Sequence, residues 1–213
     1  MNNLVPVIDL GSSKLRLSVF DEGSQIIYSS HQKVNNNFES INLENSLSKL
    51  IREAEQNLSI HLDYVTVLYD SSKFYTVDMS IKKVFDQPTL INKVYKNLIE
   101  EANFIISKNN FNDQVIHLIV NEITINDKEK LDSIVEDVKI TSLILELKFI
   151  CLNKTIVQEV SNVFKKNNLN ISNLYCSTYI KTIHYKSNFD IKNFFIFCDI
   201  GYERSSILIF YNK

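Results

Sequence analysis

Residues 5–14 read VPVIDLGSSK, and residues 194–201 read FFIFCDIG. In both stretches an apolar run ends at an aspartate that is followed two positions later by a glycine, although the chain has only three glycines in 213 residues. Short apolar runs that end at a turn signal are typical of buried strands. Glycine permits a positive φ or a close approach of the backbone to another group. Each stretch therefore predicts a strand with an aspartate at its end, a tight turn and a second strand.

Such a turn is suited to binding an anion. Successive backbone amides in a turn can surround a phosphate, and a neighbouring carboxylate can hold a hydrated Mg²⁺ ion. Asp9 with Gly11, and Asp199 with Gly201, are the two pairs that have this pattern. Sequence motifs of serine hydrolases, zinc peptidases and Walker-type nucleotide-binding proteins are absent from the chain.

Composition limits the class of protein. The chain is 45% hydrophobic and 23% charged, which suits one large globular domain or two small ones. Its net charge of −2 provides no basic field for nucleic acid. No apolar stretch approaches the roughly 20 residues that a membrane helix needs, and the N-terminus lacks the basic segment of a secretory signal. We expect a soluble chain without a nucleic-acid partner and without direct insertion into a membrane.

The cysteines and histidines form no metal-binding motif. Cys151, Cys176 and Cys198 lie far apart, which favours free thiols in a reducing cytosol. Each has apolar neighbours in the sequence, so we expect all three to pack in the core.

The first part of the chain predicts a mixed sheet. Apolar alternation and turn residues predict strands and one amphipathic helix before residue 70. The strands are expected at 4–9, 15–19, 25–30 and 64–68, with a turn at 21–24, a loop at 35–37 and the helix at 43–58.

A small α+β module is expected at about 70–148. Pro88 suits the first turn of a strongly amphipathic helix at 89–107. Short strands are expected at 73–77, 81–84, 114–120, 123–125 and 143–149, with a charged loop at 126–132. The rest of the chain predicts a helix at 156–164 ended by two asparagines, a strand at 169–174, a helix through Lys181, and a hairpin with strands at 194–199 and 205–210.

These loops and their order resemble the actin-like ATPase superfamily and, within it, the bacterial cell-division protein FtsA. The segment IDLGSSK at 8–14 resembles the first phosphate loop of the superfamily, and CDIG at 198–201 resembles the start of the second. Segments 64–68, 114–119, 145–150 and 160–174 follow in the family order. The resemblance covers all 213 residues and about the N-terminal half of FtsA. The pilus-assembly protein PilM has a similar plan.

The resemblance implies an α/β fold: an actin-like (ribonuclease H-like) subdomain with an inserted small α+β subdomain, and a second actin-like half that is largely absent. The implied segments are the first part of the actin-like subdomain at 1–69, the inserted subdomain at 70–148, the return at 149–193 and the first hairpin of the second half at 194–213. Whether the chain is a fragment or a natural short form stays open.

The resemblance also implies a site for ATP and Mg²⁺, with no catalytic residue assigned. The amides of Gly11, Ser12 and Ser13 would hold phosphates and Lys14 would neutralise their charge. Gly201 and Ser205 would belong to the second loop. Asp9 and Asp199 would hold Mg²⁺ through water across the cleft.

The second loop departs from the family pattern. Tyr202, Glu203 and Arg204 follow Gly201 where the family has further glycines. Their side chains add bulk where a phosphate would approach the backbone, and Glu203 adds negative charge that Arg204 could offset. This departure favours a protein that is not an enzyme.

The resemblance therefore implies a division scaffold that links the FtsZ ring to other division proteins at the septum. Division proteins or another copy of the chain would contact the inserted subdomain, including the outer face of helix 89–107. FtsZ would bind only if a second half exists. The expected location is the cytoplasm, at the inner face of the membrane at the division site. An actin-like ATPase with weak or lost hydrolysis and a PilM-like adaptor for a short peptide are the alternatives.

Overall fold

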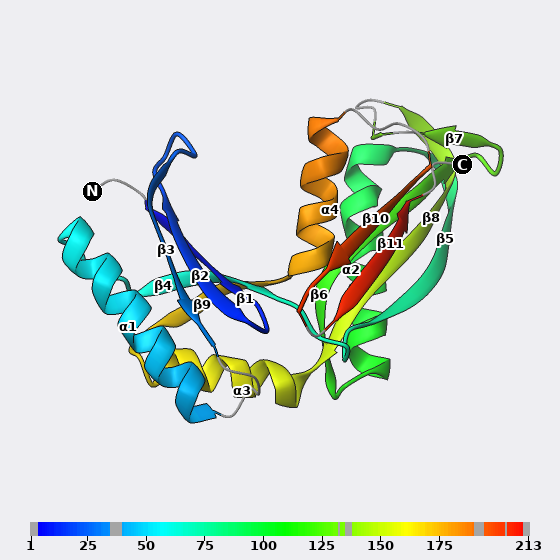
Figure 1. Cartoon of the computed structure of the whole chain (residues 1–213). Helices are drawn as coiled ribbons and strands as arrows, with labels where there is room; N and C mark the ends of the chain where they lie inside the picture. The colour runs from blue at the N-terminus through cyan, green and yellow to red at the C-terminus, as the bar shows by residue number, and fades with distance from the viewer. Residues whose placement is uncertain are drawn as a thin grey trace. The chain divides into compact units, whose positions relative to one another are not determined.

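The structure, a computed structural model, describes residues 4–34, 40–131, 133–134, 138–189, 194–202 and 204–210, with the backbone alone at 40–42 (Figure 1). The predicted loop at 35–37, the end of the predicted loop 126–132 and Glu203 lie outside the described residues. The chain divides into two compact units, of which unit 1 comprises Met1–Ser72 with Gln158–Lys213 and unit 2 comprises Lys73–Val157. The four-segment division expected from the sequence stays a prediction.

Unit 1 contains the expected mixed sheet. Its strand order is β3-β2-β1-β4-β9, in which β1 pairs antiparallel with β2 and parallel with β4. β2 pairs antiparallel with β3, and β4 pairs parallel with β9. The strands are β1 (Val5–Leu10), β2 (Lys14–Phe20), β3 (Ile26–Lys33), β4 (Tyr64–Tyr69) and β9 (Asn170–Cys176).

Helix α1 (Ser40–Leu58) packs against β2 and β3. The strand alternation turns Ile8 of β1 and Leu17 of β2 toward the buried side of the sheet, where both are fully buried. Leu47 and Leu50 of α1 are fully buried as well. Full burial of such side chains stabilises a fold by about 1.5–3 kcal/mol each. The helical and strand periodicities therefore predicted this part of the core correctly.

Two further helices belong wholly or partly to unit 1. Helix α3 (Lys154–Lys165) ends before Asn168, whose φ of 58° stops the helix as the two asparagines predicted. Helix α4 (Ser177–Asn188) follows β9 directly and continues beyond the predicted end at Lys181. No helix among the described residues has both the length and the apolar character needed to cross a bilayer.

Strands β10 (Phe195–Ile200) and β11 (Ser205–Phe210) form a separate two-stranded antiparallel sheet. One face contacts α4, where the ring centroids of Tyr185 and Phe197 lie 5.4 Å apart. The opposite face is exposed and apolar, with Ile200 81% and Ile207 66% exposed. Cys198 lies on this exposed face because it alternates with the inward residues of β10, so the expectation of a buried Cys198 was wrong. Cys151 and Cys176 are buried, as expected.

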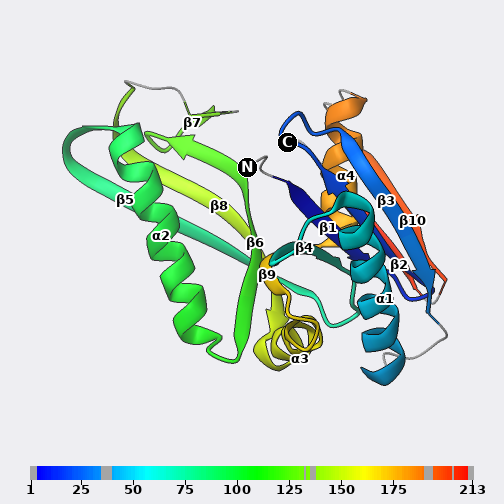
Figure 2. The same cartoon turned by 90° about the vertical axis from the view of Figure 1, so that its left-hand side faces the viewer.

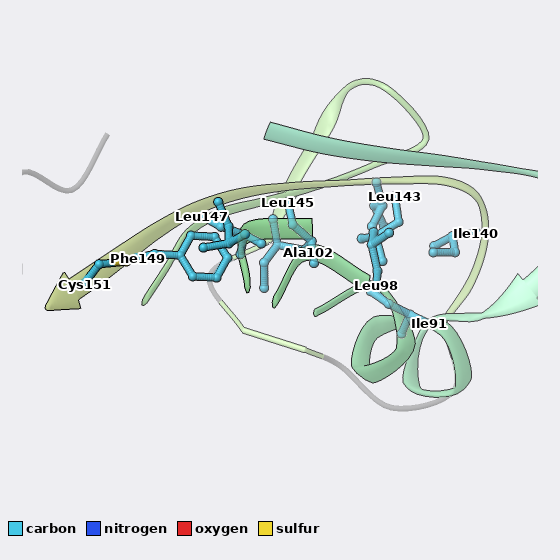
Figure 3. Packing of buried hydrophobic residues seen from close by; sticks show 12 residues of the cluster. Ile91, Leu98, Ala102, Ile140, Leu143, Leu145, Leu147, Phe149 and Cys151 are labelled. Carbon is cyan, nitrogen blue, oxygen red and sulfur yellow. The ribbon is translucent and has the colours of Figure 1, made fainter. Parts of the chain in front are cut away.

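Unit 2 is an antiparallel sheet covered by one helix (Figure 2). The strand order is β5-β8-β6-β7. Leu98 and Ala102 of the helix pack on inward residues of β8 that include Leu145 and Phe149 (Figure 3), and Ile106 belongs to the same buried cluster. The elements are β5 (Tyr75–Leu90), α2 (Ile91–Asn109), β6 (Asp113–Ile125), β7 (Glu129–Leu131) and β8 (Lys139–Asn153).

Two boundaries in unit 2 differ from the prediction. The expected strands at 73–77 and 81–84 are one long strand, β5, because β8 pairs with it throughout this region. Pro88 lies in β5 and not in the first turn of α2, which begins at Ile91. The pairing register shifts between Val84 and Thr89, and a proline is tolerated where the ladder is interrupted.

Strand β6 was also predicted in two pieces, at 114–120 and 123–125. It is one strand whose pairing register with β8 shifts between Val120 and Glu122. The alternation of inward and outward side chains is interrupted there, but the strand continues. The region expected to be a charged loop at 126–132 contains β7 after a tight turn. Asn126 and Asp127 have positive φ values of 51° and 63°, as the two central residues of a type I′ turn do, and the Lys128 amide donates to the Ile125 carbonyl.

Candidate functional site

The two Asp-x-Gly segments form hairpin turns of the same construction. The Gly11 amide donates to the carbonyl of Lys14 over 3.1 Å, and the Gly201 amide donates to the carbonyl of Arg204 over 2.7 Å. In each hairpin the aspartate is the second residue before the glycine and lies near the end of the first strand. The two predicted strand-turn-strand hairpins are therefore confirmed, and in both turns the glycine amide bonds the carbonyl three positions later.

Glycine is required in these turns for space, not for a positive φ. No glycine of the chain has a positive φ, so of the two reasons for glycine given above only the close approach applies. A Cβ atom at Gly11 would lie 2.8 Å from the carbonyl oxygen of Lys14, and one at Gly201 would lie 2.9 Å from that of Arg204. The close approach is thus made by the carbonyl of the turn itself.

The hydrogen bonds of the first turn decide which amides can meet a ligand. The Gly11 amide is used by Lys14, so it cannot also point to a phosphate. The Ser13 carbonyl accepts from the Val34 amide, whereas the amides of Ser12 and Ser13 take no part in closing the turn. These two amides are the groups of the predicted phosphate loop that a ligand could use. Lys14 lies opposite Lys33 on β3, which adds positive charge at this end of the sheet.

Asp9 is engaged through both carboxylate oxygens. Arg16 lies opposite Asp9 in the β1–β2 ladder, and its Nη1 atom is 2.9 Å from Asp9 Oδ2. The Ser177 hydroxyl donates to Asp9 Oδ1 over 3.5 Å. The Asp9 side chain is 19% exposed and the Arg16 side chain 52%, so the carboxylate is shielded from water more than its cation is.

Asp199 has a cationic partner as well. Lys181 Nζ of α4 lies 2.9 Å from Asp199 Oδ2. Ser177 and Lys181 are four positions apart in α4 and hence on one face of the helix, one turn from each other. One face of α4 therefore contacts both aspartates that the resemblance assigns to Mg²⁺.

The second turn is held to the first sheet by Arg204. Its Nη1 donates to the carbonyl of Asp70, directly after β4, over 3.2 Å. This bond occupies the side chain that was expected to offset the charge of Glu203. Tyr202 is 69% exposed, and Ser205 begins β11 opposite Ile200.

The N-terminus of α4 completes the cluster. Cys176 precedes the helix, and burial raises the pKa of its thiol, so the sulfur stays protonated at neutral pH. Ser177 and Thr178 are buried. The Thr178 hydroxyl has no hydrogen-bond partner among the described residues.

The structure brings in residues that sequence reasoning missed. Arg16 was detectable in principle, because a tight turn that pairs Leu10 with Leu15 also pairs Asp9 with Arg16. Ser177 and Lys181 come from a helix far along the chain, and no local signal links them to the two aspartates.

Mg²⁺ fits this arrangement poorly. A hydrated Mg²⁺ ion needs open carboxylate oxygens, whereas Asp9 and Asp199 each hold a side-chain cation. No cluster of three or more histidine, cysteine, aspartate or glutamate side chains suited to a metal occurs in the part of the chain that the structure describes. ATP and Mg²⁺ both remain predictions.

Comparison with known proteins identifies the fold. No protein-family model matches the chain, and no curated protein matches its sequence. In structure the chain is similar to a chain of the PilM-PilN type IV pilus biogenesis complex, with a TM-score of 0.66 and 13% sequence identity. The match covers 98% of this chain and 58% of that chain, so the present chain spans little more than half the length of its structural neighbour. The chain thus has an α/β fold similar to that of this solved chain.

Proposed function

We propose that the chain is an actin-like scaffold protein of a bacterial assembly at the cell membrane, with protein binding as its main activity. The observation that carries this proposal is the fold match over 98% of the chain to a protein solved in complex with another protein. The internal ion pairs of Asp9 and Asp199 add support, because they disfavour a Mg²⁺-dependent nucleotide cycle.

Two assemblies are candidates. In the first, an FtsA-like protein links the FtsZ ring to other division proteins at the septum, with FtsZ binding only if a second half of the protein exists. In the second, a PilM-like adaptor binds a short segment of a pilus-assembly protein such as PilN. The structural likeness supports both assemblies about equally, since it reports the fold alone.

Unit 2 offers a candidate surface for such partners. Phe104 on α2 is 65% exposed, and Phe111 just after the helix is 70% exposed. Exposed aromatic side chains are frequent anchors of protein interfaces. Phe104→Ala should weaken partner binding without unfolding unit 2. Asn97→Ala, at an exposed polar position of the same helix, should leave partner binding unchanged.

Depletion of the protein in its own cells tests the proposal. Filamentous cells with a septal location of a fluorescent fusion would identify the division role. Normal division with loss of pili would identify the pilus role. Normal division together with normal pili would contradict the scaffold proposal.

Nucleotide binding with weak or lost hydrolysis is the second candidate. Both hairpins contact one face of α4, and the hydroxyl of Thr178, which follows Ser177 in the sequence, is buried without a partner among the described residues. Titration calorimetry with ATP tests this function. Binding that Asp9→Ala abolishes would support it, and an affinity unchanged by Asp9→Ala would contradict the assignment of Asp9.

A further inference from the structure

We infer that Arg16 and Lys181 occupy the positions of a divalent cation at Asp9 and Asp199, so that neither the folding of unit 1 nor anion binding by its hairpins requires Mg²⁺. The inference concerns these four side chains together with Ser177 and does not depend on which assembly the chain serves.

The geometry at Asp9 leaves neither carboxylate oxygen open. Arg16 Nη1 lies 2.9 Å from Oδ2, and the Ser177 hydroxyl donates to Oδ1. At Asp199, Lys181 Nζ lies 2.9 Å from Oδ2. Both aspartate side chains are at least three-quarters buried.

A side-chain cation at this distance opposes metal binding in two ways. It neutralises the carboxylate whose negative charge would attract Mg²⁺, and its own charge repels the ion. The carboxylates are partly buried, which weakens screening of their charge, whereas Arg16 is 52% and Lys181 40% exposed, so water and salt reduce the repulsion by the two cations. Mg²⁺ also keeps most of its water shell, which needs carboxylate oxygens as acceptors, and both oxygens of Asp9 already have partners.

The two cations come from different elements. Arg16 is on β2, within the first hairpin, and Lys181 is on α4, outside the second hairpin. Lys181 therefore ties β10 to α4, while Ser177 ties β1 to the same helix. These contacts join both hairpins to α4 without any ligand, which is the task that a bridging metal would otherwise perform.

The test uses Mn²⁺ alone as the probe, since its free form gives an electron paramagnetic resonance signal that is lost on binding. We expect wild-type protein to leave the signal of millimolar Mn²⁺ unchanged. The double variant Arg16→Gln/Lys181→Gln frees both carboxylates and should bind Mn²⁺ at least about tenfold more tightly, because affinity follows the charge of the ligand set. The charge-preserving variant Arg16→Lys/Lys181→Arg is the matched control and should behave as wild type.

Three results decide whether Arg16 and Lys181 exclude a metal ion from Asp9. Adding Asp9→Asn to the double variant should remove the gained Mn²⁺ affinity, which locates the ion at this carboxylate. Equal Mn²⁺ binding by wild type and the double variant would overturn the inference, and so would Mn²⁺ binding by wild type that Asp9→Asn abolishes. Circular dichroism of every variant reports folding.

A second measurement on the wild type is independent of these variants. The thermal midpoint of unfolding should be the same in about 5–10 mM Mg²⁺ as in EDTA, both with and without ATP. This Mg²⁺ concentration is high enough to stabilise the protein through a site of millimolar affinity, if one existed. A midpoint that rises with Mg²⁺ would contradict the inference even if the double variant failed to fold.

Discussion

The substitution Gly11→Ala tests whether the first hairpin turn is built around the close approach of its own carbonyl. The added Cβ atom would lie 2.8 Å from the Lys14 carbonyl oxygen, well inside an ordinary van der Waals contact. That oxygen accepts the Gly11 amide, so it cannot move away without lengthening the hydrogen bond that closes the turn. The strain is a backbone strain and cannot be relieved by rotating a side chain.

The expected magnitude follows from the size of the overlap. Forcing one extra methyl group into a packed site typically costs about 1–3 kcal/mol. With a urea m-value of about 2 kcal/mol per M, the midpoint of unfolding should fall by roughly 0.5–1.5 M. Because the chain has two compact units, circular dichroism should be combined with hydrogen exchange of β1 and β2, which reports unit 1.

Gly23→Ala is the matched control. Its Cβ atom would lie 3.3 Å from the Asp21 carboxylate oxygen, which belongs to a side chain that can shift. Its effect should stay within about 0.5 kcal/mol. Equal midpoints for Gly11→Ala and Gly23→Ala would refute the argument that the carbonyl of Lys14 requires glycine at position 11.

Three further predictions concern other parts of the chain. Phe149→Ala removes a fully buried ring from unit 2 and should destabilise it by about 3–5 kcal/mol in urea unfolding, whereas Phe104→Ala should be nearly neutral. Burial lowers the pKa of His117 from 6.5 to about 4. Because the unfolded chain then binds a proton that the folded chain does not, the free energy of unfolding should fall as the pH drops from about 6.5 to 4. His117→Gln should make this dependence on pH shallower, and an unchanged pH dependence would contradict the account. Ile207→Glu, on the exposed face of the β10–β11 hairpin, should lower self-association measured by light scattering and leave the fold intact. Unchanged self-association would show that this apolar face does not mediate contacts between copies of the chain.

The hairpins and the first sheet were predictable because their signals are local. Asp-x-Gly after an apolar run marks a strand end, and alternation at Leu15 and Leu17 indicates which side of β2 is buried. The buried positions of α1 follow from its spacing of leucines in the same way.

The errors in unit 2 come from interruptions that sequence patterns cannot locate. A register shift lets β5 continue through Pro88, and another lets β6 continue past Val120. In both strands the broken alternation looks like the end of a strand. Only the long partner strand β8, which pairs on both sides, shows that each is continuous.

The candidate site was predictable only in part. Asp9, Gly11, Asp199 and Gly201 stand out in the sequence, but their partners decide what the site can do. Lys181 reaches Asp199 only because α4 follows β9 and lies on the second hairpin. A contact of this kind depends on tertiary packing, which no local pattern contains.

The central claim is the proposal that this chain works as a scaffold and not through a nucleotide cycle. Complementation of depleted cells by Lys14→Ala tests it most directly, because this substitution removes the charge assigned to phosphate and keeps the carbonyl that closes the turn. Lys33→Ala, opposite in the sheet, is the control for loss of charge. We predict that both variants restore the function lost on depletion. Failure of a folded Lys14→Ala variant where Lys33→Ala succeeds would contradict the claim.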